Sequence, residues 1–275
     1  MKSILITGCS SGIGLDAAQR LKSEGWRVFA ACRQQKDCDR LAEMGFDSPR
    51  LDYTDQASLE QALAEVLEAT GGTLDALFNN GAHPLNGLVE DLQTDGLRAI
   101  FEANFFGWHE LTRRVVPVMR AQGHGHIVQC SSTLGLGYIT FRGAYAASKH
   151  ALEALSDTMR VELRETGIKV VLIEPGPIPT AFRRNGIPWF ERFVDWKASA
   201  QRARYENVLI PRLYAEDLPP DRFELPPSAV SDALVRALGT DNPHPRYFVT
   251  KATWIMAIFM RLLPTRSVDR IVANL

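Results

Sequence analysis

The chain has 275 residues, of which 45% are hydrophobic, and this is enough for one large α/β domain around a buried sheet. Its 31 basic residues nearly balance its 32 acidic ones, so the net charge of -1 creates no overall field that attracts nucleic acid. The four cysteines include no CxxC pair, and the N-terminal apolar run is too short for a signal peptide. Both features are typical of a cytoplasmic protein.

Five apolar runs with strand character recur along the chain, at residues 4–7, 27–31, 75–78, 126–130 and 169–174. The segments between them have the apolar spacing of helices. Parallel strands require crossover connections, and the helices in those connections cover both faces of a sheet. The pattern therefore predicts an α/β protein, a doubly wound parallel sheet with helices on both faces, in a single domain over residues 1–275.

A glycine-rich turn, TGCSSGIG, joins the first strand to a helix that begins near Ile13. The small residues Gly8, Gly12 and Gly14 let the backbone approach a pyrophosphate, whose charge then lies at the positive end of the helix. Such sheets bind ligands at this first strand-to-helix junction. The turn thus predicts a dinucleotide-binding domain of the Rossmann type.

The second strand is followed by Cys32 and Arg33, where an acidic residue would bind the ribose hydroxyls of NAD. The planar donors of Arg33 can instead hold a 2′-phosphate. This favours NADP(H) over NAD as the cofactor. The alternative is that Arg33 is solvated at the start of a helix and that Asp37 or Asp39 reaches the ribose.

Tyr145 and Lys149 lie four residues apart in a helical stretch that continues to about Arg164, so they share one face of that helix. A free phenol has a pKa of about 10, too high for easy proton exchange at neutral pH. A nearby ammonium stabilises the phenolate. We therefore predict that Lys149 lowers the pKa of Tyr145 and makes it a proton donor or acceptor.

Taken together, these motifs resemble the short-chain dehydrogenase/reductase family over residues 2–180. The segments that carry the resemblance are TGCSSGIG, LDYTD with Asp52, NNGA at 79–82, FEANFFG with Asn104, CSSTLG with Ser132, the pair Tyr145 and Lys149, and EPGPIPT. NNGA departs from the usual Asn-Asn-Ala-Gly in the order of its last two residues. Both residues are small, so close packing against a cofactor is still expected.

The resemblance implies the catalytic residues Asn104, Ser132, Tyr145 and Lys149. Ser132 would bind the substrate oxygen beside the Tyr145 hydroxyl. Lys149 would also hold the nicotinamide ribose, and Asn104 would anchor a water that links Lys149 to bulk proton exchange.

The cofactor site that the resemblance implies extends over both ends of the dinucleotide. Ser10 and Arg33 would share the 2′-phosphate, and Ile13 would lie under the pyrophosphate. Asn79 and Ile178 would contact the ribose and the carboxamide. The whole predicted set is Gly8, Ser10, Ser11, Gly12, Ile13, Gly14, Arg33, Asp52, Tyr53, Asn79, Tyr145, Lys149, Pro175, Gly176, Ile178 and Thr180.

Two later segments have a different character. The segment 181–227 is long for a plain connection and rich in aromatic residues, which predicts a helical lid over an apolar substrate pocket. The alternative is a surface helical pair whose aromatic residues seal against the domain.

The amphipathic C-terminal segment 251–275 is too short in its apolar part to cross a bilayer, which takes about 20 residues. It packs within the protein or its oligomer, caps the pocket, or makes peripheral contact with a membrane.

Within the family, the chain is most similar to hydroxysteroid and retinol dehydrogenase-like members and to bacterial NADP-dependent aldehyde reductases. The leading interpretation is an NADPH-dependent carbonyl reductase that transfers a hydride to a small apolar aldehyde or ketone, with Tyr145 as general acid. The alternatives are NAD(P)-dependent oxidation of a bulky secondary alcohol, steroid-like or retinoid-like, and a non-catalytic dinucleotide-binding regulator.

The resemblance leads us to expect a homodimer or homotetramer. No metal is expected, because His124 and His126 have no third ligand nearby.

Overall fold

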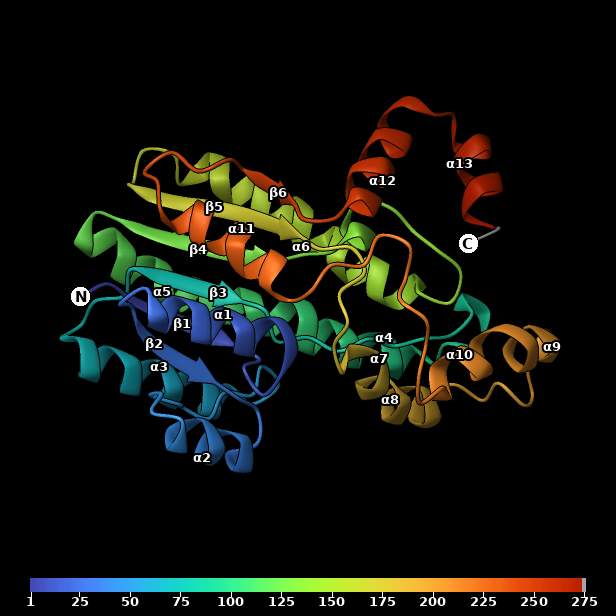
Figure 1. Cartoon of the computed structure of the whole chain (residues 1–275), viewed down its shortest axis with the longest axis horizontal. Helices are drawn as coiled ribbons and strands as arrows, with labels where there is room; N and C mark the ends of the chain where they lie inside the picture. Colours follow the sequence, from blue (N-terminus) through green and yellow to red (C-terminus); the bar gives the residue numbers. More distant parts are fainter. Residues whose placement is uncertain (274–275) are drawn as a thin grey trace.

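Six parallel strands form one sheet in the order β2-β1-β3-β4-β5-β6 (Figure 1). The structure is a computed structural model that describes residues 1–273, so positions 274 and 275 of the predicted C-terminal segment lie outside the described residues. The strands are β1 (Ser3–Thr7), β2 (Arg27–Ala31), β3 (Ala76–Asn79), β4 (Gly125–Cys130), β5 (Ile168–Glu174) and β6 (Arg246–Phe248). The five predicted strands are confirmed to within one residue at each end, whereas β6 was not predicted.

Helices cover both faces of this sheet, as the sequence predicts (Figure 1). The longer helices are α1 (Gly12–Ser23), α2 (Gln35–Glu43), α3 (Gln56–Thr70), α4 (Thr94–Phe101), α5 (Gly107–Gln122), α6 (Gly143–Glu162), α11 (Ser228–Leu238), α12 (Lys251–Leu262) and α13 (Thr265–Val272). The shorter helices are α7 (Phe182–Asn185), α8 (Ile187–Phe193), α9 (Arg202–Arg204) and α10 (Ile210–Tyr214).

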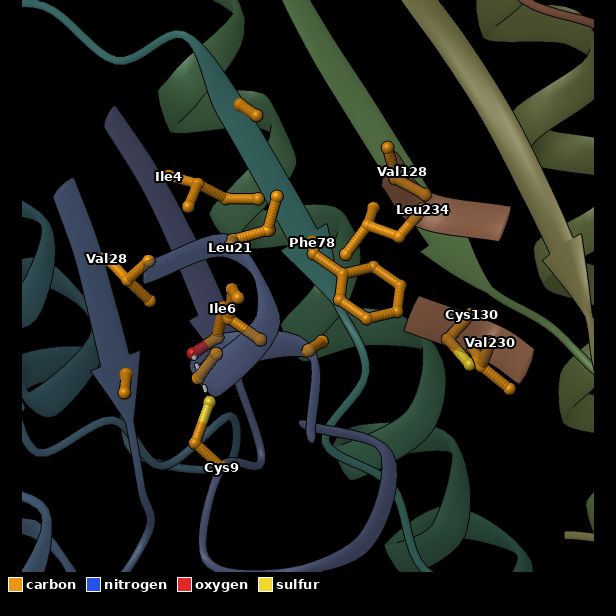
Figure 2. Packing of buried hydrophobic residues seen from close by; sticks show 14 of the residues in the cluster. Ile4, Ile6, Cys9, Leu21, Val28, Phe78, Val128, Cys130, Val230 and Leu234 are labelled. Carbon is orange, nitrogen blue, oxygen red and sulfur yellow. Dashed lines mark hydrogen bonds between the residues drawn. The ribbon is translucent and has the colours of Figure 1, made fainter. Parts of the chain in front are cut away.

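Alternate residues of each strand belong to different hydrophobic clusters. Ile4 and Ile6 of β1 pack with α1 and α11, as Figure 2 shows for Leu21 and Leu234. Leu5, between them, belongs to a second cluster that includes apolar residues of α3 and α5. Because successive side chains of a strand point to opposite faces, both faces of the sheet are buried, and this confirms the doubly wound α/β architecture.

The segment 181–227 has a core of its own on the side of the sheet's carboxyl ends. Phe190 and Tyr205 are fully buried in a third cluster, which also contains Tyr145. The Tyr205 hydroxyl donates to Asp91 at 2.7 Å and accepts from the backbone N–H of Leu88 at 2.9 Å. The segment with the short helices α7 to α10 therefore packs on the body through this cluster, and Tyr205 adds a buried polar contact.

The C-terminal helices α12 and α13 form a hairpin that projects from one end of the molecule (Figure 1). Met256 and Val268 are buried, whereas Trp254 and Leu262 are 56% and 75% exposed. Part of the hairpin thus packs on the protein, and an apolar stripe of α12 remains uncovered in the single chain. Within residues 1–273, no helix combines the length and the apolar content needed to span a membrane.

A buried charge cluster fixes β6 to the rest of the fold. Arg246 of β6 forms ion pairs with Glu153 and Glu174, and with Asp157 at 2.6 Å. Glu174 is fully buried, and this burial raises its pKa from 4.5 to about 8. Arg246 is therefore the cation that compensates two buried carboxylates.

We predict that Arg246→Met lowers the free energy of unfolding at pH 8 by about 3–5 kcal/mol, because it leaves buried carboxylates without a partner. The pKa of Glu174 is higher in the folded protein than its ordinary value. Protonation at pH 5 therefore favours the folded state of the variant, and the loss becomes smaller there. Urea denaturation at both pH values measures this, with Arg164→Met as an exposed control. Equal losses at both pH values would contradict the prediction.

Candidate active site

The carboxyl ends of the strands border a cavity of about 1230 Å³. It extends from the glycine-rich turn, past Tyr145, to Trp189 of α8 and Met256 of α12. The crevice outside the carboxyl ends of parallel strands is where open α/β sheets bind their ligands. Most of the residues singled out in the sequence line this one cavity.

The glycine-rich turn is packed too tightly for side chains. Gly8 has φ +71°, and a Cβ atom there would lie 2.6 Å from the Cα of Gly81. Gly12 has φ +58°, and its Cβ would lie 2.8 Å from Cγ2 of Thr180. Gly8 and Gly12 line the cavity, whereas Gly14 packs behind them against the Gly8 carbonyl. The turn therefore presents bare backbone to the cavity at the N-terminus of α1.

At the outer end of the cavity, Arg33 lies in the wall together with Ser10 and Asp37. Among the described residues Arg33 makes no ion pair, whereas Asp37 faces Arg40 at 3.7 Å. Asp39 does not line the cavity, and its carboxylate accepts a hydrogen bond from Gln35 at 2.8 Å. Arg33 is thus available to an anionic ligand, and Asp37 is partly neutralised.

The end of β3 differs from the prediction in one residue. Asn79 is fully buried, and its amide bonds to Tyr53 at 2.6 Å and to Thr112 and Gln129 at 3.0 Å each. It does not line the cavity, whereas the next residue, Asn80, does. The ribose contact predicted for Asn79 therefore has no support in this geometry. The side chain of Asn79 instead joins Tyr53, Thr112 and Gln129.

Other predicted cofactor residues do lie in the cavity wall. They are Ser11, Ile13, Asp52, Tyr53, Pro175, Gly176, Ile178 and Thr180. The sequence missed Thr7, whose hydroxyl accepts from the backbone N–H groups of Asn80 and Gly81 at 2.9 and 3.1 Å. This contact fixes the Asn80 loop beside the glycine turn.

Tyr145, Ser132 and Lys149 all line the inner part of the cavity. Lys149 is 1% exposed, and its ammonium donates to the Cys130 carbonyl at 2.8 Å. It lies 4.0 Å from the centre of the Trp108 ring and 5.7 Å from the centre of the Tyr145 ring. The four-residue spacing on α6 thus brings the amine below the tyrosine, as predicted.

The electrostatics of this pair differ from the prediction. Burial raises the pKa of Tyr145 above its ordinary value and outweighs the opposing effects of Ser132 and Arg142. Burial lowers the pKa of Lys149 to about 8. The amine therefore does not offset the burial of the phenol, which stays protonated at neutral pH. The predicted lowering of the Tyr145 pKa by Lys149 is wrong for the protein alone.

Asn104 does not line the cavity either. It is fully buried in a π-helical turn, Glu102–Phe106, between α4 and α5. Its side chain accepts from the backbone N–H of His83 at 3.1 Å and donates to the His83 carbonyl at 2.9 Å. The His83 ring stacks on Trp189, with centroids 3.8 Å apart. In this structure Asn104 holds the loop that carries one wall of the cavity.

The cavity narrows around apolar side chains near Tyr145. The Phe182 ring lies edge-on to the Tyr145 ring, with centroids 5.2 Å apart. The apolar wall also includes Leu134, Ile139, Trp189, Ile255, Met256 and Phe259. Both late segments, 181–227 and the C-terminal hairpin, therefore contribute to the region that would receive a substrate.

The short chain dehydrogenase family matches residues 2–189. The chain belongs to this family. It is an oxidoreductase that acts on alcohol or carbonyl groups, and such enzymes use a nicotinamide dinucleotide. The match covers the sheet up to β5 and the start of α8.

Two relatives and one solved structure cover nearly the whole chain. The uncharacterized oxidoreductase YbbO of Escherichia coli (strain K12) is 42% identical over 270 residues, with 98% of this chain and 93% of that protein covered. The NADPH-dependent 3-dehydrocapnine reductase of Ornithobacterium rhinotracheale is 30% identical and covers 98% and 96%. A short-chain dehydrogenase from Streptomyces avermitilis has a TM-score of 0.76 at 29% identity, over 98% and 93%.

The residues of this chain fit a nicotinamide dinucleotide. The two glycines without room for a Cβ leave bare backbone N–H groups at the start of α1, which suits a pyrophosphate. Arg33 provides a cation at the outer end of the same cavity, and Tyr145 and Lys149 lie at its inner end. One continuous cavity thus offers a place for each part of the cofactor.

We predict that Gly8→Ala raises the Kd for NADPH by about tenfold or more, because the turn must move away from Gly81. Gly123→Ala is the matched control, since Gly123 also has a positive φ of +76° but nothing lies within 4 Å of its Cβ position. Fluorescence titration with NADPH measures both. Equal affinities in the two variants would refute the close packing of the turn.

Proposed function

We propose that the protein is an NADPH-dependent carbonyl reductase that transfers a hydride to an apolar aldehyde or ketone, with Tyr145 as general acid. The observation that carries this proposal is the protonated, buried phenol of Tyr145 in the wall of a largely apolar cavity. A general acid must hold its proton before the reaction, and burial keeps the Tyr145 phenol protonated at neutral pH.

When bound, the reduced nicotinamide supplies the hydride. Ser132 and Tyr145 act on the substrate oxygen, where negative charge grows during reduction. Tyr145 gives up its proton to that oxygen and becomes a phenolate. Lys149, charged below its pKa of about 8, stabilises this phenolate from the next turn of α6.

Two further catalytic roles rest on the resemblance. Lys149 holds the nicotinamide ribose as well, and Asn104 anchors a water that reprotonates Tyr145 by way of Lys149. The Asn104 side chain binds the backbone of the His83 loop, and the proposed water lies beside it.

NADP(H) is the proposed cofactor because Arg33 lies in the cavity wall without an ion pair. Ser10 would share the 2′-phosphate. Asp37 is the residue that favours NAD, but Arg40 lies 3.7 Å from its carboxylate. The name of the Ornithobacterium rhinotracheale relative, an NADPH-dependent reductase, agrees with this choice.

The segment 181–227 serves as the substrate lid in this proposal. Phe182 and Trp189 from this segment, with Met256 and Phe259 from α12, cover the cavity above Tyr145. An apolar cover excludes water from the reacting carbonyl. It also selects substrates with apolar chains.

The sequence leaves two other functions open, and the geometry favours neither. Oxidation of a bulky secondary alcohol needs Tyr145 as a base, whereas burial keeps its phenol protonated. A regulator without turnover has no need for Ser132, Tyr145 and Lys149 around one cavity.

We also propose a homodimer or homotetramer in the cytoplasm. The supporting observation is the exposure of Phe106, 49%, and Val161, 56%, at the helices that carry Asn104 and Tyr145. Peripheral contact with a membrane is the alternative role for the exposed apolar stripe of α12.

We predict that Tyr145→Phe lowers kcat for carbonyl reduction by about 10²- to 10⁴-fold, because the general acid is lost. The Kd for NADPH should change little, since the ring and its packing on Phe182 remain. NADPH consumption with an aldehyde panel and NADPH titration measure the two quantities. A variant with the full reductase rate would refute the role of Tyr145.

We predict that Arg33→Asp lowers kcat/KM with NADPH by about 100-fold, because a charge-assisted contact is replaced by repulsion of the 2′-phosphate. Activity with NADH should rise or stay unchanged. Parallel assays with both cofactors measure the preference. Lys36→Asp, at a neighbouring position of the same wall, tests whether the effect is specific to Arg33. An unchanged preference in Arg33→Asp would overturn the cofactor proposal.

A further inference from the structure

Arg142 is a cation of the cavity wall that forms no ion pair within residues 1–273, although Asp221 of the same wall lies near enough to act on its charge. It directly precedes α6 and is half-buried. Its guanidinium donates one hydrogen bond, to the neutral side-chain oxygen of Asn86. Within residues 1–273 it forms no other side-chain hydrogen bond and no ion pair. A guanidinium has five N–H donors, so most of its binding capacity is unused inside a partly desolvated wall.

Three other arginines of this wall are exposed to solvent and contact neighbouring groups of the protein. Arg212 forms an ion pair with Asp221 at 2.9 Å, and Arg184 donates to the Glu216 carbonyl at 2.8 Å. Arg192 lies over the Phe193 ring, 4.9 Å from its centre. These three are solvent-exposed, unlike Arg142.

The lid end of the cavity therefore carries more positive than negative charge. It holds four arginines and one aspartate, which are Arg142, Arg184, Arg192, Arg212 and Asp221. Burial and the neighbouring Arg212 lower the pKa of Arg142, Asp221 opposes them, and the guanidinium stays charged at neutral pH. Such an end of a cavity favours a ligand with negative charge.

Arg142 is the N-cap residue of α6, three positions before Tyr145, and its charge and the Tyr145 phenol act on each other. A group bound to Arg142 therefore lies close to a carbonyl held by Tyr145 and Ser132. The remaining wall near Tyr145 is apolar, with Ile139 and Phe182 among its residues. The site thus combines one cation close to the reacting oxygen with room for an apolar chain.

We propose that Arg142 binds an anionic group of the substrate, and that the substrates are oxo acids with an apolar chain. This inference rests on the reductase proposed above and specifies its substrate class. A carboxylate or another oxyanion replaces the single neutral contact with paired charge-assisted hydrogen bonds. It also adds negative charge beside a guanidinium whose acidic neighbour in the wall, Asp221, is paired with Arg212.

The first test compares 2-oxooctanoate with its ethyl ester as substrates, with NADPH as reductant. The wild type should have the higher kcat/KM for the acid. Arg142→Gln should lower kcat/KM for the acid by about 10- to 100-fold, and for the ester by less than about threefold. Arg142→Lys should retain part of the preference, and Arg98→Gln, at an exposed ion pair, should retain all of it. Equal losses for acid and ester would overturn the inference, because Arg142 would then act through Tyr145 alone.

The second test measures binding of the same two compounds to the protein with NADP⁺, where no reduction takes place. Trp189 in the cavity wall makes tryptophan fluorescence a suitable signal. The wild type should bind the acid at least about tenfold more tightly than the ester, and Arg142→Gln should lose that difference. Selective binding without turnover would support the anion site and refute the reductase. Equal binding of acid and ester by the wild type would overturn the anion site whatever the activity.

Discussion

The burial of the Lys149 ammonium is the constraint on which the candidate active site depends. Its charge is held between the Cys130 carbonyl and the face of Trp108, at the meeting point of β4, α5 and α6. Trp108 in turn donates from its indole N–H to the Gly81 carbonyl at 2.8 Å. A buried cation is tolerated only where such partners surround it. The lysine therefore links the floor of the cavity to the loop beside the glycine turn.

The same desolvation acts in opposite directions on the two titratable groups. It keeps the Tyr145 phenol protonated, and it lowers the Lys149 pKa to about 8. A protonated phenol above a charged amine suits donation of a proton to a growing oxyanion. The Phe182 ring from the lid segment completes this apolar environment.

The sequence predicted the parts of the fold and site that local pattern determines. Apolar runs located five strands, and the glycine turn and the spacing of Tyr145 and Lys149 located both ends of the cavity. It missed β6, because Arg246–Phe248 is short and half-buried and holds its place through an ion-pair cluster between distant residues. It predicted a cofactor contact for Asn79, whereas Asn80 lines the cavity, since which of two adjacent amides faces a cavity depends on the strand's orientation in the sheet.

Other features depend on tertiary surroundings that no motif encodes. The π-helical turn points Asn104 at the His83 backbone, and the burial of Tyr145 reverses the expected shift of its pKa. The lack of an ion pair at Arg142, within the described residues, is visible only once its neighbours are placed. The roles of the predicted site residues stay proposals, whereas the family and the doubly wound sheet are established.

The most direct test of the account is the ionisation of Tyr145 itself. It can be followed by NMR of protein with ¹³C-labelled tyrosine, the resonance being assigned by its loss in Tyr145→Phe. Burial of the phenol predicts that this resonance does not titrate between about pH 6 and about pH 9, below even the ordinary pKa of tyrosine. A titration midpoint below about pH 8 would show that burial does not control this phenol and would contradict the raised pKa on which this account of the pair rests.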